Sequence, residues 1–245
     1  MRYRLKLLYR LITGTEVKAK LPHGQNPFED IKNDFEKYSF DIFFDVGANI
    51  GQTVSGIRRY FQGAEIWCFE PIKKTYGKLT QNISDKKVQC FQIGFGSQKS
   101  KLDVYINDFK TTSDRFSLKV EEVDKTSSYK ETVSIEILDD FVIENKINKI
   151  DYLKIDTEGY DLEVLLGASN LLKNDSVSFI ETEVSMNPEN NFHVKFEDVK
   201  QYLENFDYRL YGIYEQVKEW PTKKPILRRV NSLFVSKTVY SSKED

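Results

Sequence analysis

The segment FFDVGANIGQT, residues 43–53, joins an apolar strand pattern to a helix pattern through a glycine-containing turn. Asp45 stands at the end of the apolar run, and Gly47, Asn49 and Gly51 follow at alternate positions. In open parallel sheets, ligands bind beyond the carboxyl ends of the strands. Glycine there lets the backbone approach a ligand, and the amide-rich end of the next helix points into the same space. The segment therefore predicts a ligand site at the tip of this strand.

The residues around this segment alternate between strand and helix patterns. Apolar runs at 41–46, 64–70 and 88–95 predict strands, and periodic segments at 51–61 and 71–83 predict helices. Further strands are predicted at 150–156, 176–184, 208–216 and 230–237, with helices over 137–146, 158–169 and 196–206. Such alternation over short connections is typical of a parallel sheet covered by helices on both faces. The predicted fold class is α/β.

The domain organisation follows from the same patterns. We expect a helical extension over 1–38, one α/β domain over 39–238 and a polar tail over 239–245. Residues 96–131 are polar and contain an alternating stretch, which indicates a strand followed by an insertion that could cover a site. Residues 1–20 are basic with leucines at helical spacing. They predict an amphipathic helix that either packs on the domain or makes weak contact with a membrane surface.

Composition narrows the function classes. The chain has 245 residues, and its 36 basic and 38 acidic residues give a net charge of −2, so no broad positive field favours nucleic acid. Cys68 and Cys90 lie in apolar runs, which is typical of reduced thiols in the core. No apolar run reaches the roughly 20 residues that cross a bilayer. We expect a soluble, cytoplasmic protein, and the sequence makes no prediction about its oligomeric state.

A second acidic residue indicates the cofactor. Glu70 ends the second predicted strand, where a carboxylate can accept both hydroxyls of a ribose. A nicotinamide-binding turn would read G-x-G-x-x-G, whereas this turn carries Asn49 in place of the middle glycine. Asp45 would also repel a pyrophosphate. S-adenosylmethionine, whose other end carries an ammonium and a sulfonium, fits these residues better.

The motifs resemble those of the FkbM-type methyltransferases over roughly residues 40 to 236. The similar segments are FFDVGANIGQT, CFEP, ETVSIEILDDFV, IDYLKIDTEGYDLEVLLGA and NSLFV. The resemblance implies the class I methyltransferase fold, a Rossmann-like seven-stranded mixed sheet whose last strand is antiparallel. It also implies O-methylation of a hydroxyl on a sugar, on a glycolipid or polysaccharide, or on another natural product.

The same resemblance implies roles for the cofactor site. Asp45, Gly47, Asn49 and Gly51 would hold the methionine portion of S-adenosylmethionine, and Glu70 would hold the ribose. A polar residue after the third strand often meets the adenine in this fold. In this chain Gln92 is the side chain at that position.

The catalytic candidates lie after the fourth and fifth strands. Asp156 is predicted to face the sulfur end of the cofactor as a base, a metal ligand or a fixed charge, and it also counts among the cofactor-binding residues. Glu158 is either a catalytic carboxylate or a favourable charge at a helix start. Glu181 and Glu183 alternate on one strand face, so both or neither should reach the cleft. His193 is the next base, because its ordinary pKa suits neutral pH.

Three alternatives remain open at this point. Asp156, Glu158 and Glu183 could gather a divalent cation through oxygen ligands, but no compact spacing favours one, and we predict no metal. A nicotinamide-linked enzyme is disfavoured by Asn49 and by the two C-terminal strands. A catalytically silent interaction module is disfavoured by the intact glycine, aspartate and glutamate positions.

The acceptor could stack on one of four aromatic residues, Tyr105, Tyr129, Tyr214 or Trp220.

Overall fold

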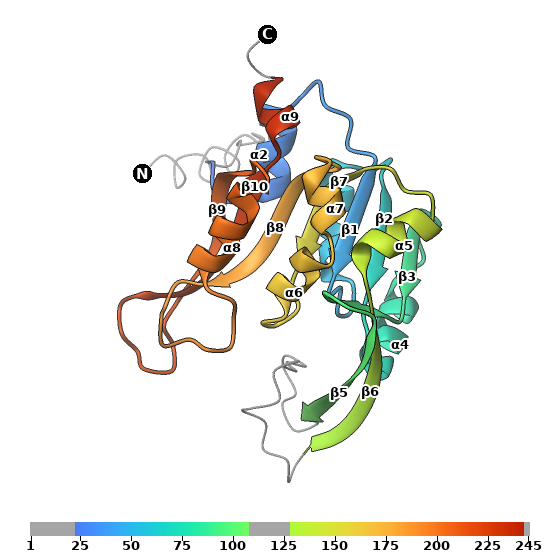
Figure 1. Cartoon of the computed structure of the whole chain (residues 1–245), viewed down its shortest axis with the longest axis vertical. Coiled ribbons are helices and arrows are strands. Elements are labelled where there is room, and N and C mark those ends of the chain that lie inside the picture. Colours follow the sequence, from blue (N-terminus) through green and yellow to red (C-terminus); the bar gives the residue numbers. More distant parts are fainter. Residues whose placement is uncertain (1–22, 108–127, 243–245) are drawn as a thin grey trace, which may run out of the picture.

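A seven-stranded sheet forms the centre of the computed structural model, which describes residues 23–107 and 128–242 (Figure 1). Its strands are β1 (Ile42–Val46), β2 (Glu65–Phe69), β3 (Val88–Phe91), β7 (Ile150–Ile155), β8 (Val177–Ser185), β9 (Arg209–Lys218) and β10 (Leu227–Val235). The order is β3-β2-β1-β7-β8-β10-β9. All neighbours from β3 to β8 are parallel, whereas β10 is antiparallel to both β8 and β9. The predicted mixed sheet with an antiparallel last strand is confirmed.

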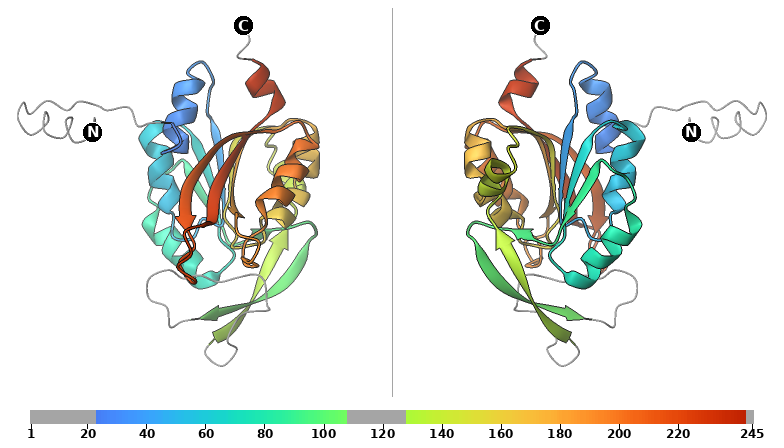
Figure 2. Two further views of the ribbon diagram at one scale, coloured as in Figure 1. Left: turned by 90° about the vertical axis from the view of Figure 1, so that its left-hand side faces the viewer. Right: turned by 90° about the vertical axis from the view of Figure 1, so that its right-hand side faces the viewer.

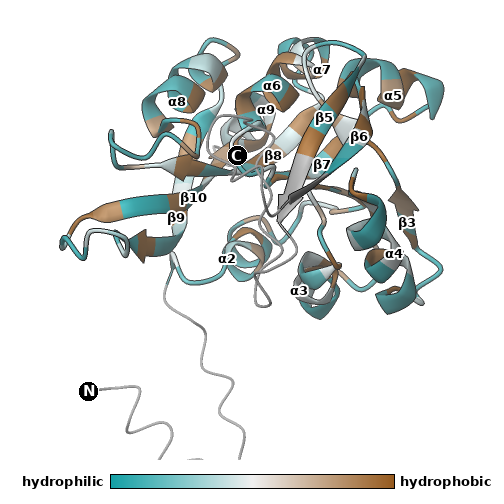
Figure 3. Ribbon diagram, turned by 90° about the horizontal axis from the view of Figure 1, so that it is seen from below, coloured by the Kyte–Doolittle hydropathy of each residue, from teal (hydrophilic) through white to brown (hydrophobic). Residues whose placement is uncertain are grey.

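Helices cover both faces of this sheet (Figures 2 and 3). One layer contains α2 (Pro27–Asp34), α3 (Gln52–Tyr60), α4 (Lys73–Asn82) and α9 (Lys237–Ser241). The other contains α5 (Leu138–Glu144), α6 (Asp161–Leu166), α7 (Ser169–Lys173) and α8 (Phe196–Glu204). Successive strand residues point to opposite faces, so Phe43 packs in the first core and Phe44 in the second. No described helix has both the length and the apolar content to cross a membrane.

The segment before β1 enters this architecture through α2. The Asn26 side chain accepts a hydrogen bond of 3.0 Å from the Glu29 amide and caps the helix, while Pro27 occupies its first turn. Phe28 and Ile31 are buried against the sheet. At the other end of the chain, Val239 of α9 is also buried, where the sequence predicted a polar tail.

A second, three-stranded sheet lies at the carboxyl edge of the first and was only partly predicted. It contains β4 (Gly94–Phe95), β5 (Ser100–Asn107) and β6 (Ser128–Glu136), in the order β4-β6-β5. The predicted single strand at 88–95 is wrong, because β3 ends at Phe91 and β4 pairs with β6 instead. The long β5–β6 hairpin projects away from the main sheet (Figure 1). The remainder of the predicted insertion, residues 108–127, lies outside the described residues.

The predicted helix at 158–169 begins later and is divided. Glu158 and Gly159 have positive φ values of 53° and 101°, so they form a turn, and α6 starts at Asp161. α6 ends at Leu166, and the following Gly167 allows close packing, because a Cβ there would lie 2.1 Å from the Gly96 carbonyl oxygen. The turn after β7 therefore holds Glu158 outside the helix, and no helix-start role applies to it.

At the opposite edge, the amino ends of β1 and β7 are joined by one carboxylate. Asp151 is buried, and its Oδ2 accepts hydrogen bonds of 2.8 and 2.9 Å from the amides of Asp41 and Ile42. The Tyr38 hydroxyl donates to Oδ1 at 2.7 Å. A buried carboxylate with three donors fixes the start of the central strand pair.

We expect Asp151→Ala to lower the free energy of unfolding by about 3 kcal/mol, because it leaves buried donors without an acceptor. Asp103→Ala, which removes an exposed carboxylate from β5, should change it by less than about 1 kcal/mol. Denaturant unfolding of both variants measures the difference. Equal losses would contradict the role of Asp151.

Candidate functional site

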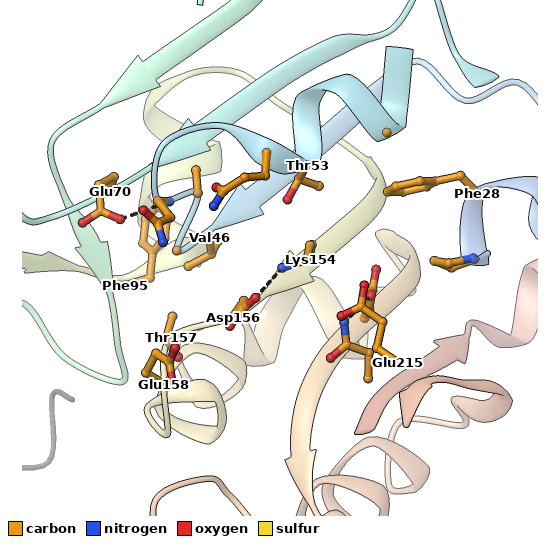
Figure 4. Close-up of a pocket in the computed structure, with 18 of the residues that line it drawn as sticks. Phe28, Val46, Thr53, Glu70, Phe95, Lys154, Asp156, Thr157, Glu158 and Glu215 are labelled. Carbon is orange, nitrogen blue, oxygen red and sulfur yellow. Dashed lines mark hydrogen bonds and ion pairs between the residues drawn. The ribbon is translucent and has the colours of Figure 1, made fainter. Parts of the chain in front are cut away.

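A cavity of about 430 Å³ lies at the carboxyl ends of the central strands, as the sequence predicted. Its walls come from the segment that leads into α2, the β1–α3 turn, β4 and the tips of β2 and β7, with single side chains from β8, β9 and β10. In Figure 4, Glu70 and Phe95 stand at one end, Lys154 and Asp156 in the middle, and Glu215 on the side of Phe28.

Glu70 lies where a ribose-binding carboxylate is expected. Its side chain is almost fully buried and accepts hydrogen bonds from the amides of Asn49 (3.1 Å) and Ile72 (2.9 Å). Burial raises the pKa of Glu70 to about 8, and Asp45 and Glu131 add to this shift, although both amides oppose it. The carboxylate thus closes the glycine turn and faces the cavity at the same time.

The three predicted turn residues have different surroundings. Gly47 has a φ of 84°, and a Cβ there would lie 2.0 Å from the Asp156 carbonyl oxygen, so this glycine packs the turn against β7. Asn49 lines the cavity with a φ of 48°. Gly51 has a φ of 92° but faces Leu79 of α4 and does not line the cavity. Direct contact with the cofactor therefore fits Gly47 and Asn49, and not Gly51.

Gln92 also differs from its prediction. It follows the last residue of β3, is exposed and does not line the cavity. Because the chain turns into β4 after Gln92, Gly94 and Phe95 form the wall at that end. An adenine there would meet an aromatic ring and backbone rather than an amide side chain.

Lys154 is the residue that sequence reasoning missed. Its side chain is mostly buried in the centre of the cavity wall, and its Nζ lies 2.7 Å from Asp156 Oδ2. Burial alone would lower the pKa of Lys154, but Asp156, Asp45 and Glu181 raise it, so the side chain is charged. The available signal was a lysine inside an apolar strand, two residues before an aspartate.

The strand register explains this group of charges. Asp45 of β1 pairs with Lys154 of β7, and Lys154 pairs with Glu181 of β8. Residues in register on neighbouring strands share a face of the sheet. The three side chains therefore form a row across the central strands, with the ammonium between two carboxylates.

Asp45 lies at the buried end of this row. It is fully buried and does not line the cavity, and its two oxygens lack a hydrogen-bond partner among the described residues. The nearby Thr53 hydroxyl favours its charged form without making a hydrogen bond of normal geometry. Burial raises the pKa of Asp45 to about 6, and Lys154 opposes this shift. The structure thus supports an electrostatic role for Asp45, which acts from behind the cavity wall and not by contact with a ligand.

Asp156 and Glu158 both line the cavity. Burial opposes the charge of Asp156, but Lys154 outweighs it and holds the pKa of this carboxyl below its ordinary value. A carboxylate paired with an ammonium is a weak base, so Asp156 suits the role of fixed negative charge better. Glu158 is partly exposed and is held in a left-handed conformation, which is a form of strain often found at functional sites.

His193 is buried next to these residues. Its Nε2 lies 2.6 Å from Glu183 Oε2 and 3.9 Å from Glu158 Oε2. Its Nδ1 lies 2.9 Å from the Asn190 amide nitrogen, and the Asn190 oxygen accepts from the Phe192 amide. This arrangement fixes Asn190 as the donor, so Nε2 carries the proton and donates to Glu183. Burial lowers the pKa of His193, which keeps the ring neutral.

Glu181 and Glu183 point to one face of β8, as predicted, but they reach different places. Glu181 lines the cavity and accepts from the Tyr152 hydroxyl and, at 2.9 Å, from Asn231. Glu183 lies beyond the cavity wall in a close ion pair with Arg229.

A metal ion has one conceivable set of ligands among the described residues. Oxygens of Glu158 and Glu183 and a nitrogen of His193 lie within 4.8 Å of one another. This set replaces the predicted one, because Asp156 pairs with Lys154 instead. The proton on His193 Nε2 and the Arg229 charge on Glu183 suit a hydrogen-bonded cluster better than a cation.

The fold and the cavity together define an S-adenosylmethionine-dependent methyltransferase of class I. A buried acid follows β2, a glycine turn follows β1, and further acidic side chains line the cavity. Residues 45–210 match the family model described as the methyltransferase FkbM domain. The chain belongs to this family, which rejects the nicotinamide-linked alternative.

Two known proteins illustrate the family relationship. The hexuronic acid methyltransferase AglP of Haloferax volcanii is 27% identical over 144 residues, which cover 59% of this chain and 56% of that protein. The match thus spans about half of the relative's length. The crystal structure of an FkbM methyltransferase from Methylobacillus flagellatus KT has a TM-score of 0.53 at 15% identity, and the match covers 85% of this chain and 48% of that one. It supports the fold.

We expect the affinity for S-adenosylmethionine to rise as the pH increases from about 7 to about 9. Glu70 loses most of its proton over this range, because burial raises its pKa to about 8, and the charged form is the stronger acceptor for ribose hydroxyls. Glu70→Gln should bind at least tenfold more weakly and lose this pH dependence. Calorimetric titration at several pH values measures the affinity and its pH dependence. An unchanged pH profile in the variant would contradict the assignment of Glu70 to the ribose.

Proposed function

We propose that the protein transfers a methyl group from S-adenosylmethionine to a hydroxyl of a saccharide, either free or part of a glycolipid or polysaccharide. The observation that carries the proposal is the carboxylate of Glu158, which lines the cofactor cavity next to His193. The name of the relative AglP supports a sugar acid as the acceptor class.

The cofactor-binding residues divide by charge and chemistry. Glu70 is suited to hold the ribose hydroxyls, with Phe95 beside the base. Asp156, Glu181 and Glu215 line the rest of the cavity, where their charges favour the cationic end of the cofactor over a neutral ligand. Lys154 offsets part of this charge and keeps Asp156 ionised.

Methyl transfer to a hydroxyl requires alignment and removal of one proton. Alignment within a closed cavity supplies much of the rate, with effective molarities of about 10⁵ M or more. A positioned base adds roughly 10²–10⁴-fold. We assign this base to Glu158, which would take the hydroxyl proton while oxygen attacks the methyl carbon in line with the departing sulfur.

His193 and Glu183 act behind this base. The Nε2 proton of His193 is donated to Glu183, and Nε2 lies 3.9 Å from Glu158 Oε2, so the imidazole lies beside Glu158 and can help to orient it without donating a hydrogen bond to it. Glu183 in turn is fixed by Arg229. In this assignment His193 and Glu183 are positioning residues, because neither lines the cavity.

We expect Glu158→Gln to lower kcat by about 10²-fold or more with little change in cofactor affinity. Asp156→Asn should weaken cofactor binding as well, because it removes a charge beside the cationic end. Labelled S-adenosylmethionine and a panel of saccharides, with and without uronic acids, provide the assay by mass spectrometry.

The product identifies the acceptor atom. A methyl ether survives mild alkali, whereas a methyl ester is hydrolysed. A stable product that forms slowly in Glu158→Gln supports the proposal. An alkali-labile product, or wild-type turnover in Glu158→Gln, would contradict hydroxyl methylation with Glu158 as the base.

A further inference from the structure

The search for an acceptor surface begins with the four aromatic residues named from the sequence. Tyr214 is fully buried, and its hydroxyl donates to Asp30 at 3.0 Å. The side chains of Tyr105 and Tyr129 lie outside the described part of the structure. Trp220, in the connection between β9 and β10, is 58% exposed. It is the candidate that remains.

Trp220 is held by its neighbours rather than loosely placed. The Arg228 guanidinium lies 5.7 Å from the centre of the indole, within the range of a cation–π contact. Glu219, which precedes the tryptophan, is buried and accepts hydrogen bonds from Arg228 at 3.2 Å and from the Asn187 amide at 2.8 Å. The Glu219 amide also donates to the Ile226 carbonyl oxygen at 2.8 Å. The indole is therefore presented in a defined orientation.

The same network leads to the residues behind the proposed base. The Arg228 carbonyl oxygen accepts from the Met186 amide at 3.0 Å and from the Asn190 side chain at 3.5 Å. Asn190 contacts His193, whose environment also includes the charge of Arg228. The β9–β10 connection and the segment after β8 lie at the same edge of the sheet (Figure 1). The tryptophan thus belongs to the surroundings of the transfer site.

Charge distinguishes this surface from the cavity. The β9–β10 connection exposes Lys223 and Lys224, of which Lys224 lies 3.4 Å from Glu189. Arg228 and Arg229 at the start of β10 are already paired with Glu219 and Glu183. The charged residues of the cavity wall are instead mostly carboxylates. An acidic cavity favours a cationic cofactor, and a basic rim around an aromatic ring favours an anionic ligand with an apolar face. A pyranose has such a face in its axial C–H groups, and an acidic sugar adds the negative charge.

We infer that Trp220 and the basic β9–β10 connection form a subsite for an acidic pyranose unit of the acceptor. The indole stacks on the C–H face of the sugar, and the exposed ammonium groups of Lys223 and Lys224 attract its carboxylate. The inference rests on the proposed saccharide function and adds the residues that recognise the ring and the charge of an acidic acceptor.

Binding of a defined probe tests this subsite. We expect trigalacturonic acid to bind the protein saturated with S-adenosylhomocysteine more tightly than the neutral galactose trisaccharide does, with an affinity that falls as salt increases. Trp220→Ala should weaken binding of the acidic probe at least tenfold, and Trp220→Phe should retain most of it. Ile226→Ala, which truncates an exposed apolar residue of the same connection, is the matched control and should bind like the wild type. Calorimetric titration measures each affinity.

Two results would overturn the inference. One is equal affinity of the wild type and Trp220→Ala for the acidic probe, including no binding by either. The other is a preference of the wild type for the neutral trisaccharide. Failure of the proposed function looks different, since the wild type would then bind the acidic probe through Trp220 while no saccharide of the panel is methylated. Cofactor affinity should be the same in all variants, because Trp220 does not line the cavity.

Discussion

The structure depends on one buried ammonium between carboxylates. Lys154 lies in register with Asp45 on one side and with Glu181 on the other, and it pairs with Asp156 at the tip of its own strand. Removing such charges from water costs several kcal/mol for each ion unless partners compensate. Compensation here requires β1, β7 and β8 to be aligned in this register. The charge row therefore couples the alignment of the central strands to the chemistry at their ends.

This row also explains the character of the cavity. Three carboxylates surround one ammonium, so the group carries excess negative charge at neutral pH, where Asp45 is mostly ionised. Part of that charge reaches the cavity through Asp156 and Glu181. A cationic ligand neutralises this excess negative charge, whereas a pyrophosphate would increase it. The choice of S-adenosylmethionine over a dinucleotide thus follows from the same interaction that fixes the strands.

Much of the fold and half of the cofactor site could be predicted, because their signals are local. The order of strand and helix patterns, the turn at Gly47 and the acid at Glu70 each occupy a short stretch of sequence. The roles of Lys154 and Asp45 could not be predicted, since they arise from pairing between strands that are far apart in the chain. The exposed position of Gln92 could not be predicted, because β3 ends at Phe91 and the chain then enters β4, which pairs with β6, a strand more than 35 residues further along the chain.

The surroundings of His193 show the same limit. Its burial comes from Glu183 on β8 and Asn190 in the following loop. The sequence spacing between these two residues and His193 does not indicate that the histidine is buried. Glu158 was recognised as a candidate, but its separation from α6 depends on the positive φ values of two consecutive residues. Residue identity indicated Glu70, Asp156 and Glu158, which line the cavity, whereas their partners required the structure.

A double-mutant cycle on Lys154 and Asp45 tests the central claim most directly. Lys154→Met should lower the free energy of unfolding at pH 7.5 by about 3–5 kcal/mol, because it leaves the buried carboxylates uncompensated. In the Asp45→Asn background the same substitution should cost at least about 1 kcal/mol less, since one of those carboxylates is already neutral. Denaturant unfolding of the four proteins gives the coupling. Additive effects within about 0.5 kcal/mol would contradict the claim that the charge row holds the central strands together.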